Sequence, residues 1–251
     1  MRVQILGCYG GELPNYRTTC FLIDDSFAFD AGALTASLSL EQLSKVDHIL
    51  LSHSHFDHVK DLPLLADLMV GRRTRPVTVH ASQECTRTLR ANMFNDSLWP
   101  DFTRIPNARN PVIRFKPFRA GSSFRIGKYK IRSISVCHPV ESCGFVISDE
   151  RSSFAISGDT GPTQALWKIV NGTPNLKALV LETSFPNQLQ ELADISGHLT
   201  PQTLRTELAK FKQNGTSVFL YHLKPAYLSE LEQEIAGLPV EILKLGDSFD
   251  F

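Results

Sequence analysis

Four side chains that commonly bind metal ions lie within six residues of this chain, in the run HSHFDH. His53 and His55 are separated by one residue, and alternate residues of an extended segment point the same way, so both imidazoles can hold one cation. Asp57 and His58 follow where the chain turns into the next element, and they can face a second cation. Imidazole and carboxylate groups are the usual protein ligands of Zn²⁺ and similar ions. The run therefore predicts a metal site.

The segments on either side of this run determine where it lies. Residues 47–51 are almost all apolar, which predicts a strand that is buried on both faces. Residues 60–70 predict a helix, with Pro63 in its first turn, where proline is tolerated. The metal-binding run is therefore expected at the end of a buried strand.

The rest of the chain alternates between strand and helix patterns. Thr200 is expected to cap a helix that has Pro201 at its first position, and Ser229 with Glu232 predicts a capping box at the start of the last helix. Strands separated by helices, with several hairpins, predict a layered α/β sandwich. Strands are expected at residues 3–6, 19–23, 27–30, 76–80, 129–136, 144–147, 153–156, 178–181 and 217–220, and helices at 84–92, 163–170, 201–211 and 229–236.

Residues 93–122 differ from the rest, because prolines and aromatic residues are frequent there. This composition predicts an ordered but irregular insertion, which is a candidate lid or binding loop. Phe94 and Trp99 could stack on a purine, and Asn95 could form a hydrogen bond with a nucleotide. The alternative is that these aromatic residues anchor the insertion to the core or to a second subunit.

Composition excludes several classes of protein. The 251 residues fit one large domain, and 26 basic residues balance 26 acidic ones, which argues against nucleic acid as a partner but leaves room for a local basic patch. No segment is apolar enough to span a membrane, and the N-terminus resembles a strand rather than a signal peptide, so we expect a cytoplasmic protein. The five cysteines show no CxxC spacing, so we expect free thiols.

The run at residues 53–58 resembles the signature of the metallo-β-lactamase superfamily, and later elements follow in that family's order. The resemblance covers essentially the whole chain, residues 1–251, and implies a four-layer αβ/βα sandwich that holds two divalent metal ions. Zn²⁺ is the first expectation, with Mn²⁺ and Fe²⁺ left open. In the ligand set that it implies, one metal is held by His53, His55 and His138, the other by Asp57, His58 and His222, and Asp159 bridges them.

Two positions separate this sequence from other members of that superfamily. Asp159 stands where β-lactamases carry a thiolate ligand, and His55 stands where diiron flavoproteins carry glutamate. An aspartate bridge suits phosphodiester chemistry, because two ions about 4 Å apart can stabilise both the attacking and the leaving oxygen. The resemblance therefore implies a phosphodiester hydrolase.

Three further runs resemble class II cyclic-nucleotide phosphodiesterases: FNDSLWP at residues 94–100, ETSF at 182–185 and SGHLTP at 196–201. Asp61 and Phe56 depart from that pattern, which usually has a small residue and leucine there. The resemblance implies hydrolysis of cyclic AMP or cyclic GMP to the 5′-monophosphate by a hydroxide that two metals activate. In this mechanism Asp57 helps to position the water, His198 protonates the leaving 3′ oxygen or contacts the phosphate, and Glu182 orients His198.

Two other readings stay open. An RNA-processing endonuclease similar to tRNase Z would share these ligands and a Glu…His pair of this kind. Such an enzyme usually also carries a flexible basic arm, and no Gly- and Lys-rich arm lies between the motifs. A non-catalytic scaffold on the same fold normally loses ligands, and this chain has all seven. The expected partner is therefore a small cyclic nucleotide, with a second copy of the chain as a candidate for a homodimer. His48 and His80 match no motif and are expected to be structural.

Overall fold

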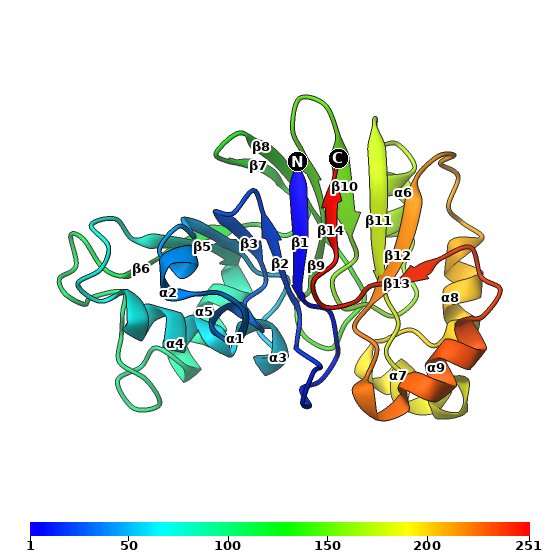
Figure 1. Ribbon diagram of the computed structural model, residues 1–251, viewed down its shortest axis with the longest axis horizontal. Helices are drawn as coiled ribbons and strands as arrows, with labels where there is room; N and C mark the ends of the chain where they lie inside the picture. The colour runs from blue at the N-terminus through cyan, green and yellow to red at the C-terminus, as the bar shows by residue number, and fades with distance from the viewer.

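The computed structural model covers residues 1–251 and contains two seven-stranded sheets with helices on their outer faces (Figure 1). In spatial order the first sheet contains β14 (Ser248–Asp250), β1 (Arg2–Gly7), β2 (Cys20–Ile23), β3 (Phe27–Phe29), β4 (His48–Leu50), β5 (Val77–Ser82) and β6 (Ile113–Phe118). The second contains β13 (Glu241–Ile242), β12 (Ser217–Tyr221), β11 (Leu176–Glu182), β10 (Ser153–Ile156), β9 (Cys143–Ser148), β8 (Tyr129–Ser135) and β7 (Ser123–Ile126).

The helices divide between the two halves of the molecule, as the colours of Figure 1 show. The first half has α1 (Leu34–Ser37), α2 (Leu40–Leu43), α3 (Phe56–Val59), α4 (Asp61–Met69) and α5 (Gln83–Asn92). The second half has α6 (Ala165–Val170), α7 (Gln190–Ser196), α8 (Pro201–Leu208) and α9 (Leu228–Ile235), with 3₁₀ turns η1 (Asn187–Leu189) and η2 (Pro225–Tyr227).

Three apolar clusters separate the four layers. One lies between the first sheet and its helices, one fills the space between the two sheets, and one lies between the second sheet and α6, α8 and α9. Phe29 on β3 and Phe145 on β9 meet edge to face across the middle cluster, with ring centroids 6.1 Å apart. This layering matches the αβ/βα sandwich that the sequence predicted.

Parallel strands place the functional segments at one edge of both sheets. The strands β3 to β6 run parallel to one another, and so do β10 to β13. Because the carboxyl ends of parallel strands meet at the same edge, the segments after β4, β10, β11 and β12 lie together there.

The structure contains no helix long and apolar enough to cross a membrane.

Most expected elements are present. The sequence analysis gave no expectation for the short elements α1, α2, α7, β7, β13 and β14, and three further differences concern segments that it did describe. Residues 113–118, which were expected within the irregular insertion, form β6, an edge strand where Pro117 is tolerated because its missing N–H interrupts no central ladder. The last helix starts at Leu228, after a 3₁₀ turn, and Ser229 does not cap it. The metal-binding run also contains a separate short helix, α3, before the helix expected at residues 60–70.

The remaining irregular segment packs against the first half of the molecule. Phe94 is 2% exposed and belongs to the apolar cluster under the helices. Trp99 packs against the same cluster and donates from its indole Nε1 to the carbonyl oxygen of Pro63, at 3.1 Å. The Asn95 side chain accepts hydrogen bonds from the backbone N–H groups of Ser97 and Leu98. These contacts favour the anchoring alternative over base stacking.

Candidate active site

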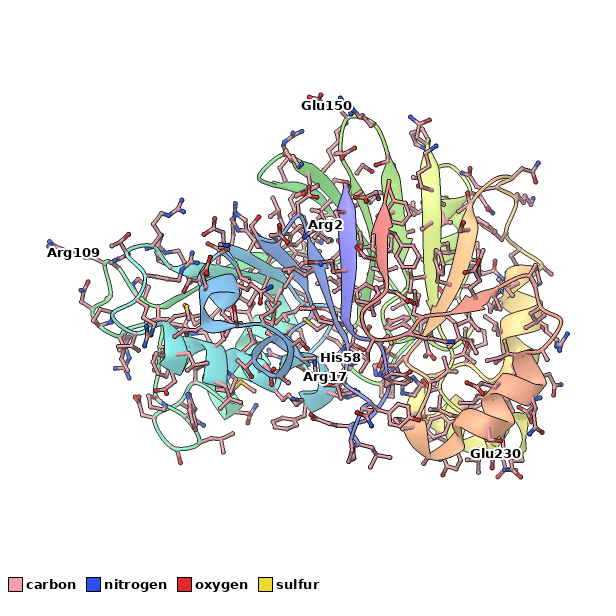
Figure 2. The ribbon with its side chains drawn as sticks, viewed as in Figure 1. Arg2, Arg17, His58, Arg109, Glu150 and Glu230 are labelled. Carbon is pink, nitrogen blue, oxygen red and sulfur yellow. The ribbon has the colours of Figure 1, made fainter.

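All seven side chains predicted as ligands lie together at the shared edge of the two sheets. Figure 2 labels His58, which belongs to α3, beneath the strands. The His55 Nδ1 and His138 Nε2 atoms are 3.2 Å apart, although 83 residues separate them in the chain. The His58 Nε2 and His222 Nε2 atoms are 3.3 Å apart across the two halves of the molecule. Nitrogen atoms at these separations can bind one cation together.

The ligand atoms divide into two groups with one carboxylate beside both. His53, His55 and His138 offer atoms within 4.8 Å of one another. Asp57, His58 and His222 form a second group of the same size. The Asp159 Oδ2 atom is 3.2 Å from the Nε2 atoms of both His58 and His222 and 3.8 Å from the Nε2 of His53.

Two buried atoms of this group have no hydrogen-bond partner in the chain, and they test whether metal ions fit. The His53 Nε2 and Asp159 Oδ1 atoms are fully buried and make no hydrogen bond. A buried polar atom without a partner costs about 1–3 kcal/mol, so such atoms normally have a partner. Both atoms belong to types that bind divalent cations, and both belong to side chains of the ligand groups. The donor set therefore fits divalent metal ions.

Partners behind the ligands fix the direction of the imidazole rings. The His58 Nδ1 lies 2.7 Å from a carboxylate oxygen of Asp30, and the His53 Nδ1 lies 3.0 Å from the Ser52 hydroxyl. The His222 Nδ1 lies 2.9 Å from the Ser184 hydroxyl. A hydrogen bond at Nδ1 directs Nε2 toward the metal and increases its basicity. Sequence analysis gave no role to Asp30, Ser52 or Ser184, although each lies at the end of an expected strand or shortly after one.

Unusual backbone conformations occur at this edge. Asp30 and His222 have φ angles of 54° and 65°, in the left-handed region that non-glycine residues seldom adopt. Gly197 has a φ of 66° and ends α7, and a Cβ atom there would be 2.8 Å from Pro139 Cδ. Its carbonyl oxygen lies 3.0 Å from the His138 Nδ1. Gly197 therefore allows the close approach that orients His138.

The carboxylates give this centre a strong negative field. Burial opposes a charge on His58, but Asp159, Asp57 and Asp30 outweigh that effect and raise its pKa well above the ordinary value. Burial lowers the pKa of His53 well below the ordinary value, so this imidazole is neutral and free to bind a cation. A site that raises the proton affinity of one ligand in this way also attracts divalent cations.

A second pair of groups lies directly beside the ligands. Glu182, at the end of β11, is fully buried, and its Oε1 lies 2.8 Å from the Nδ1 of His198. The His198 ring is 5.1 Å from the His138 ring and 5.3 Å from the His222 ring, between centroids. Burial opposes a charge on His198, but the Glu182 carboxylate outweighs it and raises the imidazole pKa. The Nε2 of His198 makes no hydrogen bond in the chain.

The geometry of two ligand groups around one aspartate agrees with a comparison of sequences. The family described as the β-lactamase superfamily domain matches residues 19–222, which include every ligand named above. The chain belongs to the β-lactamase superfamily. Within this superfamily of metallo-hydrolases, the two sheets and flanking helices form the metallo-β-lactamase fold.

Similar members of the superfamily include phosphodiesterases and RNA-processing enzymes. A Yersinia pestis protein described as a probable 3′,5′-cyclic-nucleotide phosphodiesterase is 27% identical over 262 residues, covering 90% of this chain and 75% of that protein. The crystal structure of unliganded yeast PDE1 is similar with a TM-score of 0.82 and 19% identity, covering 100% and 99% of the two chains. Human tRNase Z, short form, has a TM-score of 0.72 and 16% identity over 100% and 99%.

The two histidines without a motif lie elsewhere. The His80 Nε2 is 3.3 Å from the His48 Nδ1, and the buried His80 ring also stacks on Phe124 of β7. Neither belongs to a group of metal-binding side chains.

Of the five cysteines, all free, only Cys137 is exposed.

Proposed function

We propose that this protein is a two-metal phosphodiesterase that hydrolyses 3′,5′-cyclic nucleotides to 5′-monophosphates. The observation that carries the proposal is the buried Glu182–His198 pair, whose imidazole lies beside the ligands His138 and His222. A hydrolase that only activates water needs the metal ligands alone. The additional imidazole, held by a carboxylate, suits a reaction in which a poor leaving group must receive a proton.

Two divalent ions bound by the seven ligands would supply a hydroxide nucleophile at neutral pH and neutralise charge on the phosphate. The residues of the chain perform the remaining tasks. His53, His58, Asp159 and His222 form the buried floor of the site, while the Asp57 side chain is 30% exposed and can accept a hydrogen bond from an entering water.

His198 is suited to protonate the leaving 3′ oxygen. Glu182 holds its Nδ1, so the Nε2 remains available for substrate. Because the pKa of His198 is raised, the imidazole carries the proton that the departing alkoxide needs. Glu182 is itself fixed by the backbone N–H of Thr160 and the hydroxyl of Ser184, at 3.0 Å each. The catalytic residues in this proposal are therefore Asp57, His198 and Glu182, with Glu182 acting through His198.

The Yersinia relative, a probable 3′,5′-cyclic-nucleotide phosphodiesterase, supports this substrate class over others. RNA 3′-end cleavage of the tRNase Z kind is the alternative, and the short-form human tRNase Z supports it through the fold alone. Zn²⁺ is the proposed metal, and the cytoplasmic location and the homodimer expected from the sequence remain predictions.

Analysis of the products tests the proposal. Metal-reconstituted protein should convert cyclic AMP to adenosine 5′-monophosphate, and in H₂¹⁸O one ¹⁸O atom should enter the phosphate of the product. Formation of the 3′-monophosphate would show that the 5′ oxygen leaves instead of the 3′ oxygen, which contradicts the proposed role of His198. Cleavage of precursor tRNA without turnover of either cyclic nucleotide would replace this proposal by the alternative.

A further inference from the structure

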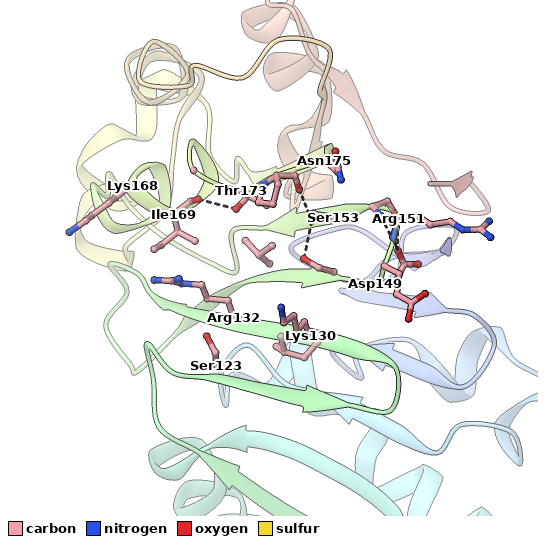
Figure 3. Close-up of a pocket in the computed structure, with 17 residues that line it drawn as sticks. Ser123, Lys130, Arg132, Asp149, Arg151, Ser153, Lys168, Ile169, Thr173 and Asn175 are labelled. Carbon is pink, nitrogen blue, oxygen red and sulfur yellow. Dashed lines mark hydrogen bonds between the residues drawn. The ribbon is translucent and has the colours of Figure 1, made fainter.

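A polar cavity of about 640 Å³ lies on the outer face of the second sheet (Figure 3). Strand β8 forms one side of it, and the end of α6 with the following loop forms the other. Only 3 of its 17 lining residues are hydrophobic, so its lining suits a charged ligand rather than an apolar one. Its volume lies in the range of about 300–1,000 Å³ that small-molecule sites occupy.

Four basic side chains line this cavity without a partner of opposite charge. Lys130 and Arg132 project from β8, Lys168 comes from α6, and Arg151 comes from the turn after β9. None of the four forms an ion pair, and none uses its side chain in a hydrogen bond within the chain. All four are exposed, so the cavity presents positive charge that no carboxylate neutralises.

The strand register adds to this positive charge. Arg125 on β7 is paired directly with Lys130 on β8, and Arg132 follows two residues later on the same face. Like charges directly opposite each other in a sheet destabilise it, and a bound anion would remove that cost. The sequence 114–132 contains seven basic residues and no acidic one, and two of the seven, Lys130 and Arg132, line the cavity.

The two acidic residues of the lining do not neutralise the cavity. The Asp149 carboxylate accepts hydrogen bonds from the backbone N–H groups of Arg151 and Ser152, and lies 3.8 Å from the N-terminal ammonium group. Glu150 is labelled at the tip of the β9–β10 turn in Figure 2, at the outer end of the molecule. The free charge in the cavity is therefore positive.

This cavity is separate from the metal-binding centre. Strand β10 begins at Ser153, which lines the cavity, and the chain reaches Asp159 six residues later. At about 3.3 Å per residue of extended chain, this stretch spans at most about 20 Å. None of the residues that line the cavity belongs to the groups of metal-binding side chains, so the cavity is not part of the proposed catalytic site.

We propose that the cavity binds a small phosphate-bearing molecule. Lys130, Arg132 and Lys168 provide charge-assisted hydrogen bonds to the phosphate oxygens. The Ser123 hydroxyl, which is paired across the strands with Arg132 and makes no hydrogen bond in the chain, donates another. The guanidinium group of Arg132 suits a phosphate in particular, because two of its N–H groups can bond to two phosphate oxygens. This proposal does not depend on the proposed catalytic function.

Backbone amide NMR spectra of the metal-loaded protein test the proposal, with inorganic phosphate and adenosine 5′-monophosphate as separate titrants. The amides of Ser123, Lys130, Arg132, Ser153 and Thr173 should shift together and saturate with each titrant. Tighter binding of the nucleotide would identify a nucleotide as the source of the phosphate. Equal affinity would show that the phosphate group alone is recognised.

Charge reversal provides the second measurement. The double variant Lys130→Glu/Arg132→Glu should weaken phosphate binding in the cavity about tenfold or more, because two charge-assisted contacts become repulsive. Lys168→Glu, on the helix rather than the sheet, should weaken it too, and thermal unfolding shows that each variant is folded. Arg109→Glu, at the exposed tip of the opposite half (Figure 2), is the matched control and should bind phosphate as the unchanged protein does.

Three results would overturn the proposal. Shifts confined to residues near the metal ligands would place phosphate only at the catalytic centre. Unchanged affinity in folded Lys168→Glu and in the double variant would remove the cavity from binding. An equal loss in the Arg109→Glu control would indicate general charge attraction. Failure of the catalytic proposal would change none of these shifts, because it concerns the other end of the sheet.

Discussion

Replacing His198 by alanine should slow hydrolysis of cyclic AMP far more than hydrolysis of an activated diester. The imidazole lies beside the ligand cluster and is held by Glu182 through a hydrogen bond of 2.8 Å. If His198 protonates the leaving 3′ oxygen, its removal leaves a strongly basic alkoxide to depart without a proton. Bis(4-nitrophenyl) phosphate releases a weakly basic nitrophenolate, which needs no proton.

The magnitude follows from the role of the group. General acid catalysis by a positioned side chain contributes about 10²- to 10⁴-fold, so kcat on cyclic AMP should fall by about that factor, equivalent to about 3–5 kcal/mol in the activation barrier. On bis(4-nitrophenyl) phosphate the fall should stay within about tenfold, because only a phosphate contact is lost. Glu182→Gln should show the same pattern more weakly, since it removes the charge and keeps the shape.

The assay compares kcat on both substrates with metal content measured on the same samples. His48→Ala is the matched control, because His48 lies outside the ligand groups and should leave both rates unchanged. Equal losses on the two substrates at full metal content would show that His198 acts on the nucleophile or on the fold instead. Unchanged turnover of cyclic AMP would remove His198 from the mechanism.

Four further outcomes are expected. Chelation should lower the melting temperature of the protein by about 10 °C, because metal at about 1,000 times its Kd stabilises the folded state by about 4 kcal/mol. In an Asp159→Ala variant the fall in melting temperature should be smaller. A fall as large as in the unchanged protein would contradict a metal site at Asp159. Asp30→Asn should weaken metal binding about 10- to 100-fold, as measured by competition with a chelating dye, because the carboxylate behind His58 is lost. Burial opposes ionisation of Asp24, but hydrogen bonds from Lys128 and Tyr129 outweigh it and lower its pKa to about 2. Because solvent screens this partly exposed carboxylate, its contribution to stability is about 1 kcal/mol, complete above about pH 4 and lost as the pH falls through 2. Denaturation of Asp24→Asn at several pH values should lack that step. Trp99→Ala should lower the free energy of unfolding by about 3 kcal/mol and leave the KM for cyclic AMP unchanged, whereas a raised KM would return Trp99 to the binding site.

The layers of the fold were accessible from sequence because they depend on local patterns. The apolar run before His53 predicted β4, and Thr200 with Pro201 predicted the start of α8, which the capping bond from the Thr203 N–H to the Thr200 hydroxyl confirms. Edge strands carry weaker signals. The apolar alternation of β6 is interrupted by Pro117, which is tolerated only because the strand lies at the edge of the sheet.

The candidate site, like the fold, contains residues that the sequence reveals and residues that it does not. Residues that bind through their own chemistry, such as the ligands in the run at residues 53–58, are visible in the sequence. Groups that orient the ligands from behind are not visible in the sequence, because their role depends on a contact between segments that are far apart in the chain. Asp30 contacts His58 across 28 residues, and Ser184 contacts His222 across 38. Phe94 illustrates the converse, since the sequence left open whether this aromatic residue stacks on a ligand or anchors the insertion, and in the structure its side chain is buried in the core.

The most direct test of the account is turnover of cyclic AMP and cyclic GMP by protein that holds two metal ions, with Asp159→Ala measured beside it. Asp159 lies beside both groups of ligands, so its loss should affect both ions. The account predicts formation of the 5′-monophosphate by the unchanged protein and a fall of at least about 10³-fold in the variant. No turnover of either nucleotide by protein with both metals bound would contradict the proposed substrate.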